Sequence, residues 1–313
     1  MKAKVKQFNI QRYGAVIVLI LMIIINGIIT PNFLHVSTLW NVLIQAFPVI
    51  LSSLGMTLVI ATGGIDISVG STMARSSIIL AKLAIHMQMN FGLALLIALL
   101  AALAFGLFNG VLVGVFHLQP IVSTLILMVS GRGIAQLVND GVVISFYGDK
   151  YADLGVYRIG GVLPIQVVMI VVAVAIVYFV VQRTSFGCYV QAVGDNDKTA
   201  RLTGVRTTGV IISVYVICAL LVGLASSFET LRLCSADPNN IGRNIELDCV
   251  AAVAVGGTNM SGGKAHVLGT LVGALVMQLV TTMVNMNDIP YAYSLVIKAG
   301  IIILALYLQR KKN

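Results

Sequence analysis

The chain has 313 residues, a formal net charge of +9 and a mean hydropathy of +0.99, with 58% hydrophobic and only 10% charged residues. Soluble domains carry roughly 25% charged residues, so this composition excludes a soluble globular protein and indicates lipid as the main solvent. The basic residues gather before the first apolar run and after the last one, which is typical of membrane topology and excludes a nucleic-acid-binding face.

Ten apolar runs follow one another along the chain, and a membrane-spanning helix needs about 20 such residues. They lie at 14–30, 41–62, 67–87, 91–116, 120–138, 163–182, 209–230, 246–256, 264–286 and 291–308. The eighth run, ELDCVAAVAVG, is too short to cross alone, so it is either a half-helix or is lengthened by its neighbours. The first run lacks a small-residue cleavage site and is expected to be a retained anchor. The sequence therefore predicts an all-α membrane protein with about ten transmembrane helices in a single domain, 1–313.

Basic residues near the ends of the runs set the expected orientation. With the N-terminus inside, eleven of them fall on the inner side: Lys2, Lys4, Lys6, Arg12, Arg183, Lys198, Arg201, Arg206, Arg310, Lys311 and Lys312. Four fall on the outer side: Lys150, Arg158, Arg232 and Arg243. An even number of crossings also puts both ends on one side. We therefore expect both termini, the loop 183–208 and the tail 309–313 in the cytoplasm.

Glycines recur at helical spacing in two of the runs. Gly106, Gly110 and Gly114 are four residues apart, as are Gly269 and Gly273. Small residues at this spacing let helix backbones approach closely in lipid, so we expect two packing seams.

One interrupted stretch occurs twice. Thr62–Ser71 reads TGGIDISVGS and Val255–Lys264 reads VGGTNMSGGK, 193 positions later, each between apolar runs. The matched positions are Gly63 with Gly256, Gly64 with Gly257, Asp66 with Asn259, Ser68 with Ser261, and Gly70 with Gly263. The shared pattern, G-G-x-[DN]-[IM]-S-x-G, predicts an internal repeat built on broken helices.

Broken helices are typical of transport proteins, because non-helical backbone at membrane depth is tolerated only where it is buried in protein or lines water. We expect Asp66, Ser68, Asn259 and Ser261 to line or gate a path for a polar solute, with the glycines permitting the break. The two copies run parallel if the eighth run crosses the membrane, and are inverted if it does not.

Several chemistries are excluded by register or spacing. The stretch GTNMSGGKA superficially matches a phosphate loop, but Thr258 stands where glycine is required and Ala265 follows the lysine. HExxH, GxSxG and paired catalytic carboxylates are missing, so we expect no enzyme activity. The four cysteines lack zinc-like spacing, and we expect no metal or cofactor. They are read as packing residues, with a Cys234–Cys249 bridge outside the membrane as the alternative.

Five ionisable residues fall inside or at the ends of runs: Arg75, Lys82, Arg132, Glu229 and Lys298. Such residues are functional candidates. The structural alternatives are that Lys82 and Glu229 extend their charged groups to the membrane–water interface, and that Arg132 binds backbone carbonyls.

The longest inner segment, Gln182–Gly209, contains KTARLTGV. Asp197, with Asn196 or Asp195 before it, is expected to cap a short helix there that stops at Gly204. Such a helix is a natural docking element for a soluble partner. The alternative is a solvated loop held to lipid headgroups by its arginines.

Three segments carry a family resemblance. GMTLVIATGGIDISVGS and ELDCVAAVAVGGTNMSGG resemble the two signature segments of carbohydrate ABC-importer permeases of the ribose/xylose/galactose type, and AVGDNDKTARLTGV is similar to their coupling segment. The resemblance runs from about residue 40 to 308. It implies a type II importer permease in the bacterial inner membrane, working as a dimer with ATPase subunits and a periplasmic sugar-binding protein. The coupling residues that it implies are Gly194, Asp195, Asn196, Asp197, Lys198, Ala200, Arg201, Leu202 and Gly204.

Within the family, Gln119–Leu137, Ser235–Asp248 and the first glycine motif look most like the galactofuranose importer permease. That resemblance implies galactofuranose as the solute and leaves a homodimer and a heterodimer open. Arg75 and Lys82 stand where the family is usually small and apolar. The competing hypothesis is a secondary transporter driven by an ion gradient, which would need no ATPase partner.

Overall fold

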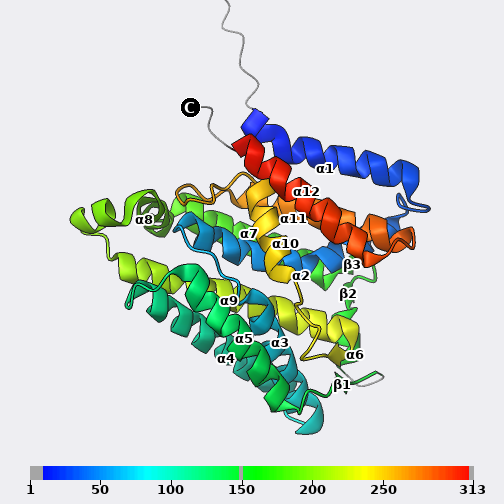
Figure 1. The fold of residues 1–313 in the computed structure, drawn as a ribbon. Helices are drawn as coiled ribbons and strands as arrows, with labels where there is room; N and C mark the ends of the chain where they lie inside the picture. Colours follow the sequence, from blue (N-terminus) through cyan, green and yellow to red (C-terminus); the bar gives the residue numbers. More distant parts are fainter. Residues whose placement is uncertain (1–9, 148–150, 310–313) are drawn as a thin grey trace, which may run out of the picture.

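The computed structural model describes residues 10–147 and 151–309, and they form an all-helical bundle (Figure 1). The helices are α1 Ile10–Ile29, α2 Val36–Ala61, α3 Val69–Ala81, the π-helical turn η1 Lys82–His86, α4 Phe91–Gly114, α5 Pro120–Val138, α6 Ala152–Gly155, α7 Ile165–Arg183, α8 Ser185–Leu202, α9 Thr207–Leu233, α10 Ile245–Val255, α11 Val267–Met286 and α12 Tyr291–Gln309. Two small antiparallel ribbons pair β1 Ile144–Ser145 with β4 Ser235–Ala236, and β2 Arg158–Ile159 with β3 Leu163–Pro164.

The prediction of ten helical runs is confirmed. Each run contains one helix, with α3 and η1 together filling the third. Among the described residues, six helices are long and apolar enough to cross a membrane by themselves: α2, α4, α5, α7, α9 and α11. The basic residues Lys2, Lys4, Lys6, Lys150, Arg310, Lys311 and Lys312, which entered the orientation prediction, lie outside the described residues.

The segment 183–208 is a correction to the prediction, because it is not mainly a loop. Helix α8 already begins at Ser185, and its helical backbone is interrupted only at Asn196 (φ −167°, ψ 104°). Gly187, Val190 and Val193 are buried at helical spacing, so an apolar stripe packs this first half against the bundle. The sequence reading missed that stripe.

Helix α2 lies in the middle of the bundle, and its second half is entirely buried. Every residue from Ala46 to Ala61 is buried, and α9, α10 and α11 pack around it. Successive helices run in opposite directions, so the segments that connect them gather at two opposite ends of the bundle. We call these the α8 end (residues 61–68, 183–206 and 256–266) and the strand end (residues 139–164 and 234–236). Because α1 and α12 each join a crossing helix at the strand end, the described ends of the chain lie towards the α8 end (Figure 1).

Both glycine seams are confirmed as packing contacts. Gly106, Gly110 and Gly114 of α4 lie against α9, while Gly269 and Gly273 of α11 lie against α10. A Cβ added to Gly106 would lie 2.5 Å from an α9 side chain, which is closer than real Cβ atoms approach. The glycines therefore let these backbones meet directly.

Helix α10 is a half-helix, and the chain before it re-enters the bundle. After β4, segment 237–244 descends from the strand end until Gly242 contacts Gly70 at the start of α3. Arg132 of α5 donates hydrogen bonds to the carbonyls of Pro238 (3.2 Å) and Ile241 (2.8 Å), satisfying backbone groups that no helix pairs. Segment 237–244 and α10 together cross the bundle towards the α8 end, as α2 does. The two copies of the repeat are therefore parallel.

Candidate functional site: a polar cavity and two broken helices

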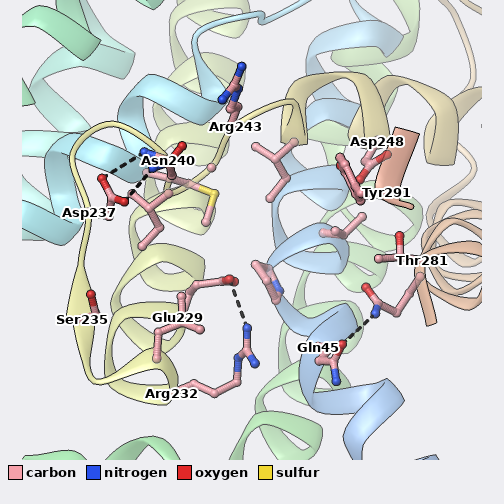
Figure 2. Close-up of a pocket in the computed structure, with 18 of the residues that line it drawn as sticks. Gln45, Glu229, Arg232, Ser235, Asp237, Asn240, Arg243, Asp248, Thr281 and Tyr291 are labelled. Atoms are coloured by element: carbon pink, nitrogen blue, oxygen red, sulfur yellow. Dashed lines mark hydrogen bonds and ion pairs between the residues drawn. The ribbon is translucent and has the colours of Figure 1, made fainter. Parts of the chain in front are cut away.

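A cavity of about 520 Å³ lies between α9 with segment 237–244 on one side and α2, α11 and α12 on the other (Figure 2). It reaches from Tyr147 and Ser235 at the strand end down to Gly242 and Ile245, where α10 begins. Cavities of this size hold small solutes. We call it the polar cavity.

The charges in the polar cavity are largely paired with one another. Glu229 and Arg232 form an ion pair one turn apart on α9 at 3.2 Å, and Lys298 of α12 reaches Asp248 of α10 at 2.8 Å. Figure 2 shows the first pair projecting between the two walls. Glu229 Oε2 and Arg232 Nε are buried and have no hydrogen-bond partner among the described residues, so this pair has hydrogen-bonding capacity that the protein does not use.

Asp237 is held in place by the segment that carries it. Its carboxylate accepts hydrogen bonds from the backbone N–H of Asn239 (2.8 Å) and from both nitrogens of Asn240 (3.1 and 2.8 Å). These hydrogen bonds and the positive charge of Arg132 nearby compensate for the partial burial of the carboxylate. This wall of the cavity is an ordered turn with a fixed negative charge.

The opposite wall presents amides and hydroxyls. Gln278 of α11 donates to Gln45 of α2 (3.4 Å) and lies near Thr282 (3.3 Å), while Thr281 and Tyr291 complete the surface. Gln45 and Thr281 are labelled on this wall in Figure 2. Such groups donate and accept hydrogen bonds without adding net charge.

The first glycine motif ends α2 with a left-handed glycine and then turns into the bundle. Gly63 (φ +81°) donates to the carbonyl of Ile60 and Gly64 to that of Val59, the paired bonds of a Schellman motif. Asp66 Oδ1 then accepts from the N–H (2.9 Å) and the hydroxyl (2.6 Å) of Ser68. The break therefore has a defined conformation.

A buried chain of hydrogen bonds fixes this turn to two other helices. Asn109 of α4 donates to Ser68 Oγ at 2.9 Å, and Ser123 of α5 donates to Asn109 Oδ1 at 3.2 Å. Asp66 and Ser68 are 4% and 3% exposed, so they are enclosed in protein and do not line the polar cavity. Gly70 follows them and contacts Gly242, which belongs to the cavity floor.

The second motif repeats the local geometry. Gly257 (φ +87°) donates to Ala254, and Thr258 to Val253, again as a Schellman motif. Asn259 Oδ1 accepts from the N–H of Ser261 at 3.0 Å, matching the bond between Asp66 and Ser68. The left-handed glycine is shifted by one position, since Gly64 aligns with Gly257 but Gly63 has the positive φ. Asn259 and Ser261 are exposed at the α8 end, away from the cavity.

Comparisons with known proteins agree with this architecture. Residues 38–306 match the family described as "Branched-chain amino acid transport system / permease component". The chain belongs to this family of transport permeases. It is therefore a multi-pass membrane transport component and not an enzyme.

Three similar proteins have names that state the sugar they transport. The permease is 34% identical to the galactofuranose transporter permease protein YtfT of Escherichia coli K12 over 95% of this chain and 89% of that protein. It is 34% identical to the ribose import permease protein RbsC of the same strain, over 96% and 94%. It is 32% identical to the fructose import permease protein FruF of Bifidobacterium longum, over 90% and 84%. No solved structure matches this chain.

The predicted coupling residues lie on and around the second half of α8, since Gly194 and Asp195 precede the interruption at Asn196 and Gly204 follows the end of the helix at Leu202. Asn196 Oδ1 accepts from the N–H of Thr199 (3.0 Å), so Asn196 is the residue of the three candidates that caps this half. Gly204 (φ +87°) ends it, donating to the carbonyl of Arg201. Asp197 pairs with Arg201 at 3.1 Å, Ala200 is buried, and Leu202 is 89% exposed. Asp195 and Lys198 are also exposed.

The remaining intramembrane candidates divide into two groups. Arg132 binds backbone carbonyls, as its structural alternative proposed, and Lys82 donates to the carbonyl of Val138 at the end of α5. Arg75 lies under the ring of Phe105, 3.2 Å from the ring centroid. Glu229 and Lys298 line the polar cavity. The four cysteines are free, so a Cys234–Cys249 bridge is not formed.

Sequence reasoning missed several residues that line the cavity, among them Gln45, Asp248, Gln278 and Tyr291. Gln45 and Gln278 are polar amides within long apolar runs, and this pattern could have identified them as candidates. The sequence did not show that segments 233 positions apart face each other.

Proposed function

We propose that this permease is the transmembrane subunit of an ATP-driven importer for a monosaccharide, forming half of the translocation pathway. ATP hydrolysis is assigned to a partner ATPase chain and delivery to a periplasmic sugar-binding protein. One observation carries the proposal: a polar cavity at one end of the bundle and an exposed, capped helix segment at the other. The strand end is then periplasmic, and both termini are cytoplasmic, in a bacterial inner membrane.

The assignment of a sugar as the solute rests on the similar proteins and on the polar groups of one cavity wall. A free amino acid carries both a carboxylate and an ammonium group, which need unpaired counter-charges. Here Glu229 is paired with Arg232, and Asp248 with Lys298, whereas Asp237 and Arg243 line the cavity without an ion pair among the described residues. The amides and hydroxyls of the opposite wall are suited to a neutral polyhydroxylated solute. Relatives whose names specify galactofuranose, ribose and fructose support the same class.

Galactofuranose is the narrower proposal. It rests on the resemblance of Gln119–Leu137 and Ser235–Asp248, and the equal identity of 34% to the galactofuranose and ribose relatives does not favour it. Ser235–Asp248 contributes Asp237 and Asn240 to the cavity wall. A homodimer and a pair with a related permease chain are both compatible with this assignment.

The second half of α8 is the proposed docking element for the ATPase. Leu202 and Lys198 project from a segment that Asn196 and Gly204 delimit, so a short rigid helix is presented at the α8 end. The residues assigned to coupling are those named above from Gly194 to Gly204.

The two glycine motifs are the proposed gate at the α8 end. Asp66 and Ser68 would fix the first turn through Asn109, and Asn259 with Ser261 would present the second turn at the surface. A path from the polar cavity must pass the contact between Gly70 and Gly242 before it reaches them. The glycines permit both turns, because their left-handed backbone is unfavourable for other residues.

The experiment is affinity purification of the tagged chain in mild detergent, followed by mass spectrometry and reconstituted uptake of a panel of sugars and branched-chain amino acids. We expect an ATPase subunit that is lost in Leu202→Asp but kept in Val142→Asp, a matched change at an exposed position of the strand end. ATP-dependent uptake of one sugar is expected. Uptake driven by an ion gradient without an ATPase would support the secondary-transporter hypothesis, and uptake of amino acids alone would contradict the sugar assignment.

A further inference from the structure

Three segments meet by backbone contact at the α8 end. Gly263, the last residue of the second glycine motif, donates its N–H to the carbonyl of Ala61, the last residue of α2, at 2.9 Å. Gly194 of α8 packs directly on both, since a Cβ placed there would overlap the Ala61 oxygen and the Gly263 nitrogen. Gly262 lies against the Gly194 backbone as well. We call the set of Ala61, Gly194 and Gly263 the glycine junction.

The junction lies next to the hinge of α8. Gly194 is two residues before Asn196, where the helical backbone is interrupted. The half before it is anchored by Val190 and Val193, which are buried, whereas the half after it is mostly exposed. The exposed half also contacts the core through the buried Ala200, and Gly194 is the point where α8 contacts the two glycine motifs.

A displacement of Gly194 moves the backbone that it contacts, because no flexible side chain lies between them. A contact between side chains can be absorbed by a change of rotamer, but Gly194 and Gly263 have no side chains and Ala61 contributes a carbonyl oxygen. Closely packed groups of this kind move together or separate. Ala61 immediately precedes the first glycine motif, and Gly263 ends the second one.

From this geometry we infer that Gly194 is a positioning residue that ties α8 to both glycine motifs at once, so that the two turns rearrange together. This inference rests on the proposed function and goes beyond it in assigning the link to a single backbone junction. It also separates Gly194 from the docking residues, because its Cα faces Ala61 and Gly263 inside the bundle.

Gly194→Ala in the reconstituted complex tests the inference, with Gly209→Ala as the control. Gly209 is a helical glycine near the same end with no atom within 4 Å of an added Cβ. We expect Gly194→Ala to co-purify with the ATPase subunit, to import about tenfold fewer solute molecules per ATP hydrolysed, and to lose stimulation of hydrolysis by solute-loaded binding protein. Gly209→Ala should match the wild type in all three measurements.

An unchanged number of solute molecules per ATP in Gly194→Ala would overturn the inference and leave the proposed function intact. Failure of the wild-type chain to bind any ATPase would instead overturn the proposed function. The two failures are thus distinguishable.

A second measurement needs no variant, in case Gly194→Ala does not assemble. Hydrogen exchange of the wild-type complex is compared with and without trapping of the ATPase by ADP and vanadate. We expect amide protection in 61–68 and 256–263 to change together with that in 190–205, the Gly263 N–H included. A change confined to 190–205, or a change in only one of the two motifs, would refute a shared junction.

Discussion

We expect the ion pair between Lys298 and Asp248 to be the main interaction that holds half-helix α10 against α12. At 2.8 Å and an effective dielectric constant of about 20, the attraction between the two charges is about 6 kcal/mol. Desolvation of both groups offsets part of it, and removal of one partner from a buried pair costs about 3–5 kcal/mol. The Asp248 side chain is 20% exposed, so water stabilises the orphaned carboxylate and we expect about 2–4 kcal/mol for Lys298→Met.

A double-mutant cycle measures this interaction. Lys298→Met, Asp248→Asn and the double variant are compared by thermal unfolding of the detergent-solubilised chain. The first variant should lower Tm by roughly 5–10 °C, and the double variant should recover much of that loss because no unpaired charge remains. If the effects of the two single changes simply add, with a coupling energy below about 0.5 kcal/mol, the pair does not fasten α10 and this reasoning is wrong.

Two further predictions concern single positions. Gly106→Ala should destabilise the chain by about 1–3 kcal/mol through overlap with Ala219, measured by thermal unfolding, whereas Gly133→Ala, with open space around it, should be nearly neutral. Asn196→Ala should lose about 0.5–2 kcal/mol of capping free energy and speed proteolysis within 197–202.

The positions of the helices followed from local sequence, and the cavity did not. Apolar run length determined the ten runs, and the repeated G-G-x-[DN]-[IM]-S-x-G pattern predicted both breaks because left-handed glycines and an Asx bond are local requirements. The first half of α8 was missed because its buried stripe is only three residues long. The pair of Lys298 with Asp248 was missed because it depends on which helices lie side by side.

The same distinction applies within the predicted site. Asp66 and Asn259 have the same local turn, yet one is enclosed by Asn109 and Ser123 and the other is exposed. Local sequence specified the turn, whereas its surroundings come from α4 and α5 on one side and open surface on the other. Sequence similarity between repeats therefore predicted conformation, and not exposure.

The re-entrant segment before α10 has a consequence for how the chain enters the membrane. An eleven-residue helix is too short to span the hydrocarbon by itself, and segment 237–244 leaves backbone carbonyls that lipid cannot satisfy. Arg132 satisfies two of them, and it belongs to α5, which is synthesised about a hundred residues earlier. The N-terminal helices must therefore already be inserted and packed when 237–255 leaves the ribosome. A fragment ending after α9 should insert stably, while in one beginning at β4 the residues 237–255 should stay at the membrane surface until α2 to α5 are supplied, even though α11 can cross by itself.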